Sequence, residues 1–199
     1  MGSGTGIRGE RAASTHAKLV AAARELFAER GYHGTGTPEV VALAGVTRGA
    51  LYHHFRDKEA LFEAVFRQLE RELRELSAEP VLHLADDRFR QLQEGTRSFL
   101  RIVAARADIQ QILLIDGPAV FGWLRWRELG ADFTLGDLSL AFSDLMQAGT
   151  IRRQPILPLA HLILAALNEA SLMIAHSTDA EATRVEVDEA LQSLIAGLR

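Results

Sequence analysis

The sequence predicts an all-α protein built from about nine or ten helices. Apolar residues recur at three- and four-residue spacing along most of the 199 residues, and no alternation typical of β-strands persists anywhere. No uninterrupted apolar run reaches the roughly 18 residues that span a bilayer. The composition, 48% hydrophobic and 24% charged, is typical of a soluble globular protein. We therefore expect a cytoplasmic protein without a membrane partner.

The cysteine count and the charge distribution exclude some kinds of functional site and favour others. The chain has no cysteine, which excludes a disulfide framework, a thiolate nucleophile and a metal site with Cys ligands. The net charge of −4 argues against a general nucleic-acid binder, but residues 1–58 carry eight Lys or Arg and five Asp or Glu, a net +3. A basic N-terminal part joined to an acidic body favours binding of a polyanion by the first part.

The first helix is predicted to begin near Thr15 and to end at Gly31, because apolar residues repeat with helical spacing between them and glycine suits the end of a helix. Residues 1–14 precede this pattern. Their start is rich in Gly, Ser and Thr, and we expect a flexible N-terminus that is too polar for a signal peptide.

Two short helices follow. Thr37 supplies a hydroxyl that caps the first of them, and Pro38 occupies the first turn, where its missing N–H costs nothing. Residues 44–46 (Ala-Gly-Val) break the pattern. Thr47 then caps a helix that runs to about Phe55.

The long helix that comes next has one apolar stripe, a cap at Asp57 and an end before Pro80. Asp86 and Asp87 precede the following helix. Residues 116–118 (Asp-Gly-Pro) are expected to interrupt the apolar run that comes after it.

Three more features complete the helical pattern. A stripe from Leu135 to Met146 predicts a helix that ends at Gly149. Leu159–His176 predicts a helix that is apolar on most sides, after a turn bracketed by prolines. Residues 177–179 (Ser-Thr-Asp) begin the final helix.

Residues 36–55 have the proportions of a helix-turn-helix. Gly45 permits the positive φ of the tight turn, and Val46 fills the gap between the two helices. In the second helix Leu51 and Phe55 lie four residues apart and are expected to face the core.

The remaining side of that helix has residue types that suit contact with a nucleic-acid groove. Arg48 and Tyr52 share a face, and the small Gly49 and Ala50 allow close approach near a helix N-terminus that suits phosphate. The alternative interpretation is an ordinary packed helix with a buried tyrosine. A metal site at His53 and its neighbour His54 is not expected, because adjacent residues on a helix point about 100° apart.

The stretch Thr15–Phe66 resembles the DNA-binding domain of the TetR family of bacterial transcriptional regulators. The residues that carry the resemblance are Leu19, Ala23, Leu26, Phe27, Gly31, Tyr32, the run Ala44–Phe55, and Asp57-Lys58-Glu59-Ala60-Leu61. One departure is Gly36, where the family usually has Thr or Ser, so the sequence places the cap at Thr37. The resemblance implies a DNA-binding domain over residues 15–66, and residues 67–199 are consistent with a helical C-terminal domain for ligand binding and dimerisation.

The resemblance also implies roles for the matching positions. Arg48 and Ala50 face base edges, and Gly49 allows close approach. Thr47 caps the recognition helix and donates to phosphate. Tyr52 and His53 contact phosphate or sugar with some base contact, and Lys58 binds phosphate from the following helix. Thr37 is a further candidate DNA-binding residue, at the start of the preceding helix. Physically, Arg48 is the best candidate for specificity, since a guanidinium pairs with guanine O6 and N7 together.

One recognition helix reads only a few base pairs, so we expect a homodimer on a palindromic double-stranded operator. Leu159–His176 has small residues beside leucines, and the final helix offers a further apolar face. These last two helices are predicted to form a four-helix interface, as the resemblance also implies. The alternative is that both fold back on the core of their own chain, which explains one face of the first helix and not the other.

Members of the family usually hold a ligand in the C-terminal domain. The candidate lining residues are Phe99, Leu113, Asp116, Phe121, Trp123, Trp126, Phe142, Met146 and Asn168. Such a lining favours an apolar or aromatic small-molecule effector, with Asn168 as an orienting hydrogen-bond group. The alternative is that the aromatic residues are core and that Asn168 pairs across the dimer.

The leading functional hypothesis is a homodimeric repressor that a small effector releases from its operator. A regulator without a ligand, or an activator, is the alternative. An enzyme is not expected, because the chain has no Gly-rich phosphate loop, no nucleophile elbow and no His-x-x-x-His pair. No cofactor is expected either.

Overall fold

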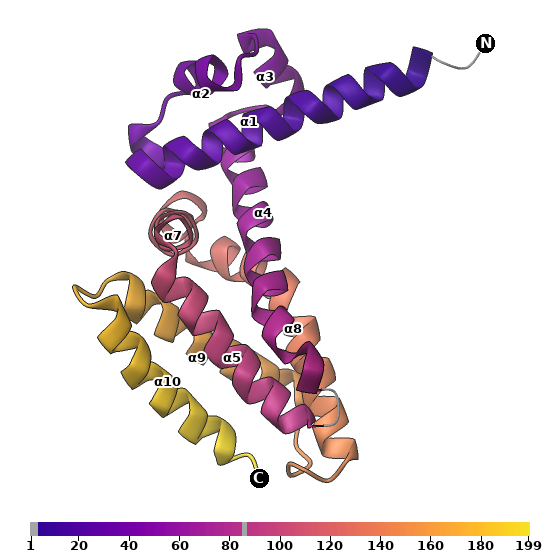
Figure 1. Ribbon diagram of the computed structural model, residues 1–199, viewed down its shortest axis with the longest axis vertical. Coiled ribbons are helices and arrows are strands. Elements are labelled where there is room, and N and C mark those ends of the chain that lie inside the picture. The colour runs from indigo at the N-terminus through magenta and orange to yellow at the C-terminus, as the bar shows by residue number, and fades with distance from the viewer. Residues whose placement is uncertain (1–3, 85–86) are drawn as a thin grey trace. The chain divides into compact units, whose positions relative to one another are not determined.

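The structure is a computed structural model that describes residues 4–84 and 87–199. Every regular element in these residues is a helix, which confirms the all-α prediction (Figure 1). The chain forms two compact units, residues 1–68 and 69–199. Residues 1–3 of the expected flexible N-terminus, and Asp86, which was expected just before a helix, lie outside the described residues.

The N-terminal unit consists of α1 (Gly4–Gly34), α2 (Thr37–Ala44), α3 (Arg48–His54) and the first part of α4 (Lys58–Ala78). Helices α2 and α3 both pack against α1 (Figure 1). The shared core consists of apolar side chains that are at most 6% exposed: Leu19, Ala23, Leu26, Phe27, Val40, Leu51, Phe55, Phe62 and Phe66. Their helical spacing in the sequence is the reason why each helix has one face to bury.

Helix α1 begins earlier than the sequence pattern predicted. The prediction placed its start near Thr15, whereas the chain is already helical at Gly4, so residues 4–14 extend the helix. At the other end, Gly31 has φ 70°, which breaks the regular helix as expected for glycine at this position.

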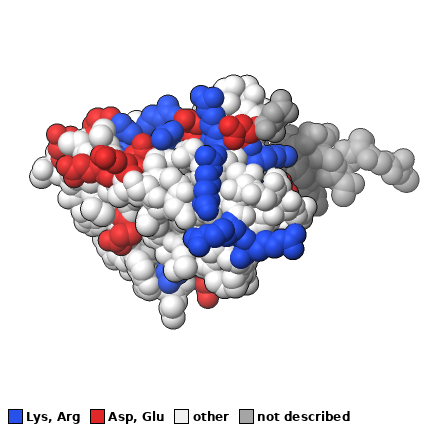
Figure 2. Space-filling model, turned by 90° about the horizontal axis from the view of Figure 1, so that it is seen from below, with Lys and Arg blue, Asp and Glu red and all other residues white. Residues whose placement is uncertain are grey.

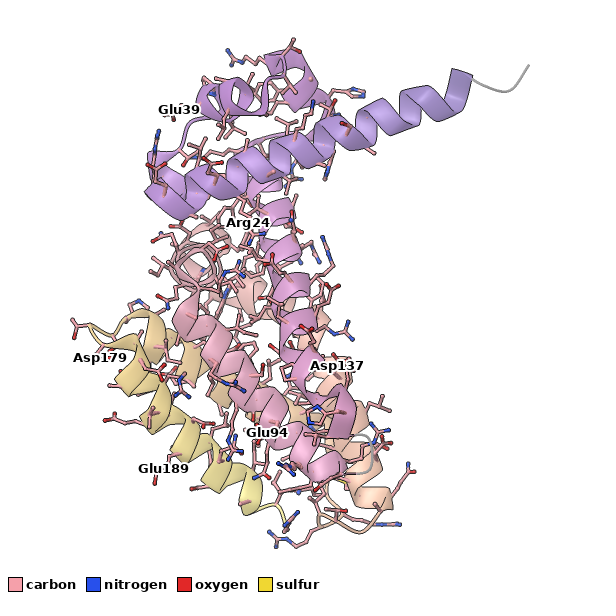
Figure 3. All side chains as sticks on the ribbon, in the orientation of Figure 1. Arg24, Glu39, Glu94, Asp137, Asp179 and Glu189 are labelled. Atoms are coloured by element: carbon pink, nitrogen blue, oxygen red, sulfur yellow. The ribbon has the colours of Figure 1, made fainter. Side chains whose placement is uncertain are left out.

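The cap of α2 corrects the prediction by one residue. Gly36, not Thr37, occupies the cap position, and the side chain of Glu39 accepts a hydrogen bond from the backbone N–H of Gly36 (2.8 Å). Glu39 also accepts from Arg30 of α1 (2.8 Å), which joins the two helices (Figure 3). The Thr37 hydroxyl is thereby released from a capping role.

The C-terminal unit contains the end of α4 and eight further elements: η1 (Glu79–Leu84), α5 (Arg88–Ala105), α6 (Ala107–Ile109), η2 (Gln110–Asp116), α7 (Gly117–Phe121), α8 (Trp123–Gln147), α9 (Ile156–Ala175) and α10 (Ala180–Ala196). Helices α5, α9 and α10 pack side by side, and α8 packs on α9 (Figure 1). The predicted cap at Asp57 is confirmed, because its side chain accepts a hydrogen bond from the backbone N–H of Ala60. Asp87 and Asp179 cap α5 and α10 in the same way, each by accepting from the N–H three residues later.

Residues 116–118 do not interrupt the helix, which corrects the prediction. Asp116 and Gly117 both keep right-handed helical angles, and η2 is a π-helix in which the N–H of Gly117 donates to the carbonyl of Ile112. Pro118 falls in the first turn of α7, where a missing N–H is tolerated. The break comes instead at Gly122, with φ 75°.

Charged side chains lie on the surface and between the helices of this unit. On the face seen in Figure 2, many Asp and Glu side chains gather toward one side, Lys and Arg lie both beside them and across the middle of the face, and much of the surface is uncharged. Ion pairs tie elements together, for example Arg106 with Glu72 of α4 (3.0 Å) and Arg97 of α5 with Asp188 of α10 (3.5 Å).

Helix α9 is the one element in the described ranges that is long and apolar enough to cross a membrane. Polar residues interrupt its apolar sequence, so it has no unbroken apolar run, but most of its residues are apolar. One face packs inside the unit through residues such as Ala160, Leu164 and Leu167, while Leu162 is 68% exposed and Met173 50% exposed. The helix therefore has a second apolar face that this chain alone leaves uncovered.

Candidate functional site

The turn between α2 and α3 has the geometry that the sequence predicted. Gly45 has φ 63°, in the left-handed region where glycine is favoured. The side chain of Thr47 caps α3 by accepting a hydrogen bond from the N–H of Ala50 (3.2 Å). Leu51 and Phe55 are buried, so the opposite side of α3 faces outward.

Tyr52 contradicts the alternative of a packed helix with a buried tyrosine, because it is 44% exposed. The guanidinium of Arg48 lies over its ring, 5.5 Å from the centroid. A hydrogen bond to Thr37 of α2 lowers the pKa of Tyr52, and a hydrogen bond to Arg48 adds to this effect. The helix-turn-helix thus holds Thr37, Arg48 and Tyr52 together as one polar cluster, with Thr37 using the hydroxyl that does not cap α2.

Small residues at the start of α3 leave room for a ligand. A Cβ added at Gly49 would meet nothing nearer than the Thr47 hydroxyl oxygen, at 3.9 Å, so packing within the protein does not require glycine there. Ala50 is half-buried and His53 is exposed. Both Gly49 and His53 therefore face outward on the same short helix as Arg48.

The two adjacent histidines have different surroundings. His54 contacts the rings of His16 (5.9 Å between centroids) and Phe55 (6.4 Å). Burial is the largest cause of the lowered pKa of His54, with smaller contributions from His53 and His16. Within residues 4–84 and 87–199, no group of three His, Asp or Glu side chains is arranged to hold a metal ion.

Lys58 has a structural contact that the sequence did not predict. Its ammonium donates to the carbonyls of Tyr32 (2.8 Å) and Thr35 (3.0 Å) and lies 4.0 Å from the centre of the Tyr32 ring. A cation in the first turn of a helix is unfavourable by itself. The carbonyls of Tyr32, in the last turn of α1, and of Thr35, just after it, offset this cost, so a phosphate is not needed to explain the charge.

A second candidate site lies within the C-terminal unit. A cavity of about 390 Å³ is bounded by α4, η1, α5, α8 and α9. Its apolar walls include Leu73, Leu92 and Leu138. A smaller cavity of about 30 Å³ shares five lining residues with it: Glu70, Leu73, Phe99, Thr134 and Leu167. The larger volume is within the range of small-molecule sites.

Four of the nine residues predicted to line a ligand site do line these cavities. Phe99 borders both, and Leu113, Trp126 and Asn168 border the smaller one. Trp126 is nearly buried, and its ring N–H donates to the carbonyl of Leu113 (2.7 Å). Asn168 is half-buried at the cavity wall.

The other five predicted residues line neither cavity. Trp123 is 51% exposed, because Gly122 turns the chain and starts α8 with this side chain outside. Phe142 is fully buried, and Met146 and Asp116 are each 8% exposed, so these three are part of the packed interior. Phe121 is half-buried at the end of α7. The core interpretation thus applies to Phe142 and Met146.

The charged residues of the larger cavity were not predicted from the sequence pattern. Arg74 of α4 forms two hydrogen bonds with Asp137 of α8, one of them at 2.9 Å (Figure 3). Arg88 of α5 lies 4.0 Å from Asp144 of α8. Glu70 of α4 borders both cavities. Its position directly after the stripe residue Leu69 was the one available sign, because a charge there lies at the edge of the apolar face.

Comparison with known proteins covers both units. Residues 19–65 match the family model described as bacterial regulatory proteins, tetR family, and residues 89–198 match the tetracyclin repressor-like C-terminal domain. Among curated proteins, the transposon Tn10 TetC protein of Escherichia coli is 46% identical over 55 residues, which are 28% of each chain. The chain thus spans less than a third of that relative.

Solved structures match over nearly the whole chain. A TetR-family transcriptional regulator from Pectobacterium atrosepticum is 33% identical, with 95% of this chain and 96% of that chain covered and a TM-score of 0.83. FadR from Bacillus subtilis, solved in complex with stearoyl-CoA, is 20% identical, with 87% and 96% covered and a TM-score of 0.68. At 20% identity, the similarity to FadR shows a shared fold and nothing about function. On the two family models and the first structure, the chain belongs to the TetR family of bacterial transcriptional regulators.

Proposed function

We propose that this transcriptional regulator reads DNA through the exposed side of α3. The observation that carries the proposal is the cluster of Arg48 and Tyr52 beside the small, uncrowded Gly49, at the amino end of a capped helix. The guanidinium has the reach and donor geometry to pair with guanine, and the phenol and the helix N-terminus suit phosphate. His53 and Thr37 extend the same surface and contact the backbone of the duplex.

Selection of bound fragments from random DNA tests this proposal. The expected result is a site with two-fold symmetry. Arg48→Ala is expected to weaken binding to that site by about 1–3 kcal/mol and to relax base choice at one position in each half-site. Arg90→Ala is the matched control, since Arg90 is an exposed arginine on α5 of the other unit. Equal affinity of the Arg48 variant and the control would refute the docking of α3.

The protein is proposed to act as a homodimer joined through α9 and α10. A palindromic operator needs two copies of the recognition helix. The support is the uncovered apolar face: Leu162 and Met173 on α9, and Val185 (51% exposed) and Leu194 (59% exposed) on α10. These helices pack against each other, and two copies form the predicted four-helix interface.

Sedimentation equilibrium measures the dimer directly. Leu162→Glu combined with Leu194→Glu is expected to yield monomers, because two carboxylates per chain would be buried in an apolar interface. Leu124→Glu is the control, since Leu124 on α8 is 76% exposed and lies outside this face. A double variant that remains dimeric would place the interface elsewhere.

The larger cavity is proposed to hold a small effector that releases the protein from its operator. FadR of Bacillus subtilis was solved with stearoyl-CoA, which shows that a protein of this fold accommodates an organic ligand. Helix α4 supplies Glu70, Leu73 and Arg74 to the cavity wall and is continuous with Lys58 in the DNA-binding unit. A ligand that displaces α4 therefore changes the separation of the two recognition helices.

Linkage makes this proposal testable. Effector and operator must weaken each other's binding by the same factor. The first factor is the ratio of operator affinities measured with and without a bound compound. The second is the ratio of the affinities of that compound measured with and without operator. A compound that binds tightly in the cavity while operator affinity is unchanged favours a regulator without ligand response. A reporter gene carrying the selected site separates repression from activation.

A further inference from the structure

The lining of the larger cavity has an unbalanced charge. It contains three acidic and two basic side chains: Glu70, Asp137 and Asp144, with Arg74 and Arg88. Arg74 is bonded to Asp137, and Arg88 faces Asp144. Both cations are therefore already matched by carboxylates of α8. Glu70 is the acidic residue left over.

Glu70 has no partner among the described residues, whether by hydrogen bond or by ion pair. The element opposite it is α8 at Gly130, which has no side chain to offer. A Cβ placed on Gly130 would lie 3.7 Å from the nearer carboxylate oxygen of Glu70. Around it, the wall shared by the two cavities is formed by Leu73, Phe99, Leu167 and one hydroxyl residue, Thr134.

Burial among these groups raises the pKa of Glu70 to about 7. A carboxylate in such surroundings loses hydration without gaining a counter-charge. A bound ammonium or other cationic donor would compensate the charge, and in a low-dielectric cavity such a hydrogen bond is stronger than in water. A ligand carboxylate would instead meet a like charge, with both available guanidinium groups already engaged.

On this basis we propose that the effector is a small organic cation: an apolar or aromatic body that fills the cavity and an amine that binds the carboxylate of Glu70. The inference rests on the proposed effector function and names the chemical class of the ligand. The apolar body contacts the leucine walls and Phe99, whose ring face also attracts a cation.

Three probes that share one apolar body test the inference. Calorimetric titration of the full-length protein at pH 8, without DNA, is carried out with 4-phenylbutylamine, 4-phenylbutan-1-ol and 4-phenylbutanoate. The amine is expected to bind at least about tenfold more tightly than the carboxylate. Glu70→Gln is expected to remove about tenfold of the amine's affinity and to leave the affinity of the alcohol unchanged.

Glu75→Gln is the matched control, because Glu75 is an exposed glutamate on the same helix that does not line the cavity. Equal binding of all three probes, or tighter binding of the carboxylate with loss in an Arg74→Met variant, would overturn the inference. So would failure of all three to bind. These titrations contain no operator, so they are independent of whether a ligand releases DNA; amine binding that leaves operator affinity unchanged would contradict the proposed function alone.

Discussion

Replacing Glu70 with Gln is expected to stabilise the ligand-free protein at pH 8 and to have little effect at pH 5. The pKa of Glu70 is about 7 in the folded protein, against 4.5 for an unperturbed glutamate. Below pH 4.5 the carboxyl group is protonated in both the folded and the unfolded state and contributes no pH dependence. Between pH 4.5 and 7 the unfolded chain releases this proton while the folded protein retains it, so stability falls as the pH rises.

The size of the effect follows from the shift in pKa. Each pKa unit corresponds to about 1.4 kcal/mol, so the shift from 4.5 to about 7 gives roughly 3–4 kcal/mol above pH 7. This is an upper value, because the cavity beside Glu70 admits water that solvates the ionised form. We therefore expect a gain of about 1–3 kcal/mol for Glu70→Gln at pH 8.

Urea unfolding of the wild type and the variant at several pH values between 5 and 8 measures this gain. The difference between the two proteins isolates Glu70, because the other titrating groups are common to both. Glu75→Gln, on the exposed side of α4, is expected to show no such trend. A difference for Glu70→Gln that stays constant across this pH range would refute the assignment of a buried, uncompensated carboxylate.

Three further predictions concern the DNA-binding unit. Gly49→Ala should fold normally, since a Cβ there meets nothing closer than 3.9 Å, yet should weaken operator binding by about tenfold; an unchanged operator affinity would show that DNA does not approach this point. Thr47→Ala should lower unfolding stability by about 1 kcal/mol through loss of the cap on α3, while Thr47→Ser retains it; equal urea midpoints for both variants would contradict this role. Lys58→Met should lose about 1–3 kcal/mol of stability with its bonds to the carbonyls of Tyr32 and Thr35, and should lower the salt slope of DNA binding by about one. A salt slope that does not change would leave Lys58 with its structural role alone.

The helix-turn-helix could be predicted from the sequence because the residues that indicate it lie close together in the chain. Gly45 is needed for a positive φ, Thr47 caps the next turn, and Leu51 and Phe55 share a buried face through their four-residue spacing. Each signal involves residues within one or two helical turns. Such patterns remain valid in any tertiary context that keeps one side of the helix buried.

Predictions from residue type were wrong where the same local sequence is compatible with two backbone structures. Glycine at position 36 and threonine at position 37 both serve as caps, and the reach of Glu39 to the Gly36 N–H decided between them. Gly117 and Pro118 normally indicate the end of a helix, yet the π-helical η2 continues directly into α7. In both cases the outcome depended on hydrogen bonds made by neighbouring residues, which residue type alone does not specify.

The amino-acid sequence determined the order of helices, the helix-turn-helix motif and the family. The reason is that hydrophobic periodicity and helix caps depend only on residues within one helix or directly beside it. The location of the cavity does not follow from the sequence, since it depends on which faces of α4, α5 and α8 meet. Packing of these three helices placed Phe142 in the interior and left Glu70 opposite a glycine without a counter-charge. In the N-terminal unit, the tertiary fold turned Lys58 toward the backbone carbonyls of Tyr32 and Thr35. A charged side chain has its chemistry set by the groups around it, and those groups come from distant parts of the chain.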